Sequence, residues 1–184
     1  LANQKNTKAF IIISAGFAEA NKTGNSIEKK ITAVINSVNG CLIGPNCIGV
    51  INRNYKGVFT FPIPKYSPDG CDLISSSGAT AVFIMESGTL LGVKFTNVYS
   101  VGNSAQTTIE DILQYMDVHY NPSLDSPIKL LYLETINNPE KLLKHASSLI
   151  KKGVKIAAIK AGSTLEGSRA ATSHTGAIAS SDVT

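Results

Sequence analysis

The 184-residue sequence contains no tryptophan and is poor in charged residues, which make up 16% of it. A typical soluble domain carries about 25% charged residues, so we expect part of the surface to be covered by something outside this sequence. The net charge of +4 is small and dispersed, and it does not form the basic stripe of a nucleic-acid-binding protein. A polyphosphate ligand would still suit this modest positive charge.

Long hydrophobic runs, metal-ligand clusters and paired cysteines are also absent. No apolar run approaches the ~20 residues needed to span a bilayer, and the first residues do not form a signal peptide, so no membrane partner is expected. Cys41, Cys47 and Cys71 form no CxxC motif and leave an odd count, which favours a reducing, cytoplasmic setting. The three histidines lack metal-ligand spacing, so a zinc site is not expected.

Short apolar, β-branched runs alternate with helical patterns along the chain. This alternation predicts an α/β fold with a parallel sheet covered on both faces. Between Asn52 and Gly70 the periodicity disappears, which indicates a connection between two domains. We expect strands at 9–13, 41–43, 71–75, 97–101, 128–133 and 154–160, and helices at about 25–38 and 79–87, from Thr107 or Thr108, and from Asn138.

Small or functional residues follow the expected strands, and in doubly wound sheets ligands bind beyond the carboxyl ends of the strands. The segments concerned are 14–16, 44–47, 75–78, 102–103, 134 and 161–162. Any one strand-to-helix turn needs glycine in any case, but six together favour a ligand-binding edge. The turn 75–79 joins a strand to a helix, which predicts an anion site at the helix N-terminus. A serine-rich helix cap is the alternative.

His174 lies in a loop of small residues, and a neutral imidazole is a good nucleophile toward phosphorus near neutral pH. Glu134 ends an apolar strand and could hold one ring N–H, so that the other nitrogen presents its lone pair. The alternatives are an exposed loop histidine and a helix-capping carboxylate. Cys47 has no histidine or basic residue near it in the sequence, so we expect a small buried residue rather than a nucleophile.

Six motifs in this order resemble the NDP-forming acyl-CoA synthetases, which are relatives of the succinyl-CoA synthetase α subunit. They are GPNCIGV at 44–50, SGA at 77–79, VGN at 101–103, YLE at 132–134, KAG at 160–162 and SHTGA at 173–177. The resemblance covers nearly the whole chain, and SHTGA is its most specific motif. It implies a ligase that interconverts acyl-CoA, NDP and phosphate with a carboxylic acid, CoA and NTP, through an acyl phosphate and a phosphohistidine.

The resemblance also assigns roles to particular residues. His174 matches the phosphorylated histidine and Glu134 the glutamate that orients it. Phosphate binding falls on Ser77, Gly78 and Ala79, at the start of a helix, and on Gly102 and Asn103. Coenzyme A binding falls on two loops, made of Ile13, Ser14, Ala15 and Gly16 and of Gly44, Pro45, Asn46 and Cys47, with the second near the acyl-thioester end.

By the same resemblance, residues 1–65 are the C-terminal part of a Rossmann-like CoA-binding domain with its linker. Residues 66–184 are then a flavodoxin-like CoA-ligase domain, truncated at its end. The family's glycine-rich loop and its ATP-grasp domain are absent from the sequence, so we expect a fragment that is inactive alone. Its expected partners are a small carboxylic acid and its CoA thioester, phosphate, and an ATP-grasp domain or subunit that brings ATP or ADP and Mg²⁺. An oligomer is also expected.

Two other interpretations remain open from the sequence. One is a CoA- or acyl-CoA-sensing module without catalysis, and the other is a ligase-like regulatory region of a protein acetyltransferase. The presence of both His174 and Glu134 weighs against them, because binding alone needs neither residue and the regulatory region usually lacks the histidine.

Overall fold

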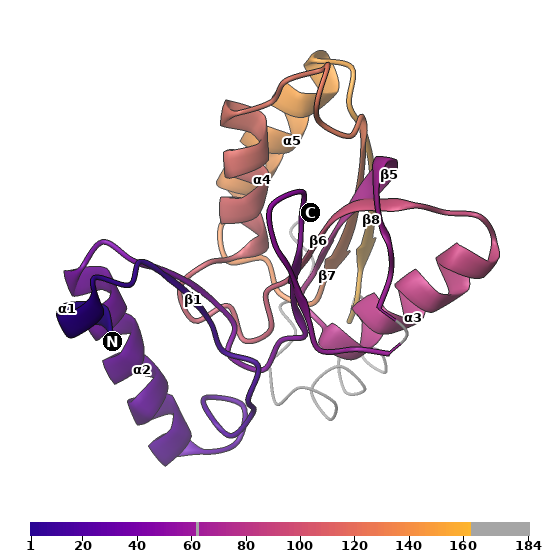
Figure 1. The fold of residues 1–184 in the computed structure, drawn as a ribbon. Helices are drawn as coiled ribbons and strands as arrows, with labels where there is room; N and C mark the ends of the chain where they lie inside the picture. Colours follow the sequence, from indigo (N-terminus) through magenta and orange to yellow (C-terminus); the bar gives the residue numbers. More distant parts are fainter. Residues whose placement is uncertain (62, 163–184) are drawn as a thin grey trace.

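A six-stranded sheet forms the centre of the protein, shown in Figure 1. The structure is a computed structural model that describes residues 1–61 and 63–162. The strands lie in the order β4-β3-β6-β5-β7-β8, with β6, β5, β7 and β8 parallel and β3 antiparallel to β6 and to β4. Their bounds are β3 Gly49–Ile51, β4 Lys56–Val58, β5 Tyr66–Ser75, β6 Phe95–Ser100, β7 Ile128–Leu133 and β8 Lys155–Lys160.

Helices cover both faces of this sheet, because its central strands present apolar side chains on alternate sides. On one face, Leu73 of β5 packs with Ala81 and Met85 of α3 (Gly78–Leu90). On the other face, Ile74 belongs to a larger core with the apolar sides of α4 (Ile109–Val118) and α5 (Pro139–Lys151). The central parallel strands β5 and β6 therefore form the two-sided buried layer that the sequence predicts, whereas β8 at the edge is mostly exposed.

A smaller unit at the N-terminus contains its own two-stranded parallel sheet. It consists of α1 (Ala2–Lys5), β1 (Ala9–Ile11), α2 (Lys22–Ser37) and β2 (Cys41–Ile43). The unit lies at one side of the larger sheet in Figure 1 and is joined to it by hydrogen bonds. Gln106 accepts the N–H of Leu42 at 2.6 Å and donates to the carbonyl of Gly40 at 3.0 Å.

The segment expected to be a connection, 52–70, contains β4 and the first residues of β5, and the unexpected strand β3 lies directly before it. β3 and β4 form one edge of the six-stranded sheet, and β5 begins at Tyr66, five residues before the expected strand. β3 and β4 are three residues each, too short to show a period in sequence. At Gly49 an added Cβ would lie 2.2 Å from the carbonyl oxygen of Gly57, so this hairpin depends on a close backbone approach. A division of the chain at 65/66 stays a prediction.

None of the helices described in the structure combines the length and apolar character that crossing a membrane would require.

Candidate functional site

Hydrogen bonds hold the turns after three neighbouring strands together at the carboxyl edge of the large sheet. The N–H of Ser76, after β5, donates to the carbonyl of Tyr132 at 3.0 Å, and the N–H of Glu134 donates to Ser76 Oγ at 3.3 Å. The N–H of Val101, after β6, donates to the carbonyl of Ser75 at 2.9 Å. Three of the six turns predicted to form a ligand edge therefore lie side by side.

The turn before α3 is organised by its serines. Ser77 is the N-cap and accepts the N–H of Thr80 at 3.2 Å, while Ser75 Oγ donates to the carbonyl of Ser77 at 2.7 Å. In the described part of the chain, no acceptor takes the N–H of Gly78 or Ala79. The helix start thus has both the serine cap and two N–H groups that could bind an anion.

Glu134 lies at the end of β7 and is 7% exposed. A carboxylate at such a depth needs a hydrogen-bonding or charged partner. His174, its predicted partner, falls outside the described residues, so their pairing stays a prediction. Ala161, after β8, donates its N–H to the carbonyl of Leu133 at 2.8 Å, which brings the last described turn next to Glu134.

The two loops predicted to contact coenzyme A lie against each other in the N-terminal unit. The N–H of Asn46 donates to the carbonyl of Ser14 at 3.0 Å, and Gly44 has φ +95° with its Cβ position 2.4 Å from the Ile12 carbonyl oxygen. Residues 13–16 are exposed, and nothing lies within 4 Å of a Cβ placed on Gly16. The first loop is therefore open to a large ligand, while the second is tightly packed behind it.

Cys47 is buried, as predicted, with 4% of its surface exposed. Burial raises the pKa of its thiol, and the S–H group donates to the carbonyl of Ile12 at 3.3 Å. A buried thiol with a raised pKa is a poor nucleophile. The residue thus supports the second loop by packing.

Gly102 and Asn103 connect the sheet edge to both of these loops. Gly102 has φ +55°, and a Cβ at this position would lie 2.2 Å from the carbonyl oxygen of Pro45. The N–H of Asn103 donates to the same carbonyl at 2.9 Å. The turn after β6 therefore touches the second loop through backbone, and the contact has no room for a side chain at 102.

Two carboxylates beside Asn103 were not identified from the sequence. The side-chain amide of Asn103 donates to Glu28 at 3.0 Å and also to Glu19. Although burial acts to raise it, hydrogen bonds from Asn103 and from nearby backbone N–H groups hold the pKa of Glu19 below its usual value. The signal available in the sequence was a lone acidic residue three positions after Gly16, in an otherwise small and apolar loop.

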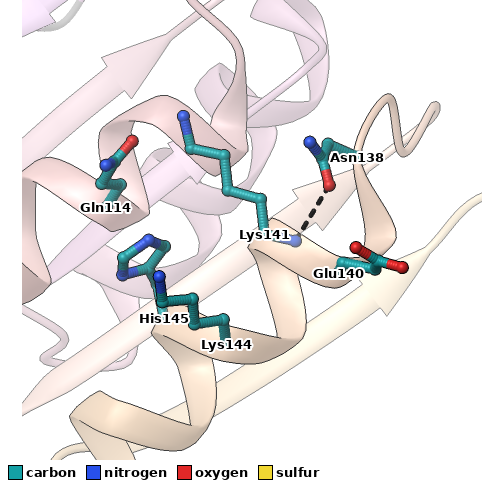
Figure 2. Close-up of a pocket in the computed structure, with 6 residues that line it drawn as sticks. All are labelled: Gln114, Asn138, Glu140, Lys141, Lys144 and His145. Carbon is teal, nitrogen blue, oxygen red and sulfur yellow. Dashed lines mark hydrogen bonds between the residues drawn. The ribbon is translucent and has the colours of Figure 1, made fainter.

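A pocket of about 320 Å³ lies between α4 and α5, away from these loops (Figure 2). Its lining is polar and consists of Gln114, Asn138, Glu140, Lys141, Lys144 and His145. Nδ1 of His145 is 2.7 Å from Oδ2 of Asp117, and Lys141 is paired with Asp111 at 2.5 Å. Among the described residues, none of the predicted site residues lines this pocket, so the candidate site is the carboxyl edge of the sheet.

The strand order β6-β5-β7-β8, with ligand-type turns at the carboxyl ends, defines a doubly wound α/β protein of the flavodoxin type. Residues 68–184 match the family model described as the succinyl-CoA ligase like flavodoxin domain. The chain belongs to this family, and the relatives that it matches are named ADP-forming CoA ligases. The resemblance and the fold class predicted from the sequence are thus confirmed.

Relatives and solved structures agree with this assignment. An acetate–CoA ligase (ADP-forming) of Methanocaldococcus jannaschii is 37% identical over 98% of this chain and 24% of its own length. A 4-hydroxybutyrate–CoA ligase (ADP-forming) of Nitrosopumilus maritimus is 32% identical over 97% of this chain and 26% of its own. An α subunit of an acetate–CoA ligase (ADP-forming) II from Pyrococcus furiosus is 33% identical over 97% of this chain and 38% of its own length.

Among solved structures, a dinucleotide forming acetyl-coenzyme A synthetase 1 of Ca. Korarchaeum cryptofilum, in complex with phosphate and ADP, has a TM-score of 0.81. It is 30% identical and covers 95% of this chain and 36% of its own. The chain therefore spans about a quarter to two fifths of the length of these relatives.

Proposed function

We propose that this chain provides the CoA-side and phosphohistidine-side parts of an ADP-forming acyl-CoA synthetase. The reaction interconverts acyl-CoA, ADP and phosphate with a carboxylic acid, CoA and ATP. The proposal rests on one observation: the turns predicted to bind phosphate and the loops predicted to bind CoA lie together at one edge of the sheet. The turns after β5, β6 and β7 lie there together with the loops after β1 and β2, in a chain that belongs to the family.

On the phosphate side, the proposed nucleophile is His174. One ring nitrogen attacks the phosphorus of an acyl phosphate, the carboxylate leaves, and the phosphohistidine then passes its phosphoryl group to ADP. Glu134 would hold the other ring N–H, and its burial in the sheet edge suits a fixed acceptor. The N–H groups of Gly78 and Ala79, which have no acceptor among the described residues, and the positive end of α3 would stabilise the phosphoryl charge. Gly102 lies one strand further along this edge.

On the CoA side, the proposed contacts are Ile13 to Gly16 and Gly44 to Cys47. Exposed backbone around Gly16 suits close approach of the cofactor. The second loop reaches α3, because an added Cβ on Gly78 would lie 2.8 Å from Ile48, the residue after Cys47. The acyl-thioester end of the cofactor would thus lie near the phosphate-binding helix start.

The nucleotide and Mg²⁺ are proposed to bind an ATP-grasp domain or subunit that acts together with this chain. The substrate would be a small carboxylic acid, the assembly an oligomer, and the compartment the cytoplasm, where the three free cysteines would stay reduced.

Labelling tests the proposal. The full-length protein, with its nucleotide-binding partner, is incubated with γ-labelled ATP and Mg²⁺. We expect one acid-labile label on His174, lost in His174→Ala, and discharged when CoA and a carboxylic acid are added. His119→Ala is the matched control, because His119 is an exposed histidine at the end of α4. Undiminished label in His174→Ala would disprove the histidine relay.

A further inference from the structure

The side chain of Asn103 uses both of its N–H donors and its carbonyl acceptor on the loops and helix of the N-terminal side. Nδ2 donates to Glu19 and Glu28, Oδ1 accepts from Asn46 Nδ2 at 3.3 Å, and the backbone N–H donates to Pro45. A carboxamide has two N–H donors and a carbonyl acceptor. An aspartate could not donate, and a serine could not serve three partners.

The carboxylates on the other side of these bonds hold the first CoA-side loop. Glu19 also accepts the N–H groups of Gly16 and of Phe17, the latter at 3.2 Å. Glu28, from α2, accepts the N–H of Ala18 at 3.3 Å. Each carboxylate thus links loop backbone to the amide of Asn103, and bonds to an ionised acceptor are stronger than neutral ones.

Asn103 also holds the second CoA-side loop, residues 44–47. Asn46 has φ +56°, so its side chain is presented from a left-handed backbone position, and Gly102 leaves room for the Pro45 carbonyl. One residue in the turn after β6 therefore connects the phosphate edge to both CoA-side loops.

We propose that Asn103 is a positioning residue that sets the CoA-side loops, through Glu19, Glu28 and Asn46, at the distance from the phosphate edge that transfer between acyl phosphate and CoA requires. This inference rests on the proposed function. It gives Asn103 a role different from the phosphate contact expected from the sequence, because its N–H groups are already taken by protein acceptors. Small misplacements of reacting groups lower rates severely.

The rates of two half-reactions, phosphorylation of His174 by ATP and discharge of the phosphoenzyme by CoA and acid, distinguish a loss of positioning from a loss of folding. A folding defect would lower both rates, whereas a positioning defect would lower only the second. In the full-length protein with its nucleotide partner, Asn103→Asp places a third carboxylate beside Glu19 and Glu28. We expect label transfer from γ-labelled ATP to His174 to change less than about twofold, while discharge of the phosphoenzyme by CoA and acid slows about tenfold or more. A second change, Glu19→Gln, supplies a donor opposite the introduced carboxylate, so the double variant N103D/E19Q should recover part of the discharge rate.

Asn97→Ala is the matched control. Asn97 lies on β6 and donates its amide to a carboxylate, Asp72, at 2.7 Å, but it precedes the end of the strand that meets the loops. It should not slow discharge selectively. Equal loss of both half-reactions in Asn103→Asp, or unchanged discharge, would overturn the positioning role. Absence of label in the unmodified protein would instead refute the proposed function.

Discussion

Single residues decide how closely the loops at the candidate site approach one another. Gly102 is the clearest example, since its positive φ and its backbone contact with Pro45 both exclude a side chain. Gly92, after α3, also has a positive φ, +84°, but nothing lies within 4 Å of its Cβ position. Alanine substitutions at these two glycines would therefore distinguish the cost of backbone strain from the cost of a steric contact.

We expect Gly102→Ala to destabilise the protein by about 2–4 kcal/mol and Gly92→Ala by about 1 kcal/mol. The shared part is the cost of a left-handed alanine, and the excess at 102 comes from the contact with the Pro45 carbonyl. Urea unfolding followed by circular dichroism measures both. Equal losses of unfolding free energy in the two variants would show that the turn at 102 and the Pro45 loop can move apart at no energetic cost.

At the level of elements, α4 and α5 are joined by a carboxylate near the end of α4. Asp117 accepts from Lys152 at 2.7 Å and lies 2.7 Å from His145. Burial acts to raise its pKa, but hydrogen bonds from Lys152, His145 and Ser148 outweigh this and lower the pKa to about 2. Ionised Asp117 is thus more stable in the folded protein than in the unfolded chain.

This pKa predicts acid sensitivity in the α4–α5 pair. Because the folded value lies below the ordinary 3.8, the stabilisation is complete above about pH 4 and is lost as the pH falls through 2. Asp117→Asn should cost about 1–2 kcal/mol at pH 7 and less near pH 2, as measured by urea unfolding across pH. Asp69→Asn, at an exposed position of β5, is the control. A deficit that stays constant from pH 7 to pH 2 would contradict the ion-pair explanation.

For the whole molecule, the important contact is that between the N-terminal unit and the large sheet. Gln106 bridges the two, since it bonds Leu42, Gly40 and Asn36 of the unit from the segment after β6. Without this side chain, the N–H of Leu42 would lose its acceptor, and unsatisfied buried groups are costly.

Gln106→Ala should therefore loosen the unit as a body. We expect amide hydrogen exchange at Leu42 to accelerate at least about tenfold, which corresponds to about 1.4 kcal/mol, while exchange at Leu131 in β7 stays unchanged. Gln114→Ala, on the pocket side of α4, is the control and should leave both sites unaffected. Faster exchange at Leu131 as well would indicate global destabilisation.

Much of the fold could be predicted where a local pattern was long enough. The strand at 128–133 was predicted with its observed bounds, and the helix start at Asn138 was correct, since its side chain caps α5. Of the two candidates for the α4 cap, the structure selects Thr108, which forms a capping box with Asp111. β3 and β4 were missed because each is three residues long and contains a glycine, so no apolar run marks it as CLI marks β2. β3 also pairs with β6, which lies far along the chain.

By itself, the sequence determined the α/β alternation, the turns that follow the strands, the burial of Cys47 and the family. These features depend on neighbours within a few positions, where spacing and residue type are informative. Only the tertiary structure decided that Glu19, Glu28, Asn46 and Asn103 form one network, because Asn103 and Glu19 are 84 residues apart. Hydrogen bonds across such separations follow from how the N-terminal unit packs on the sheet, which no local pattern encodes.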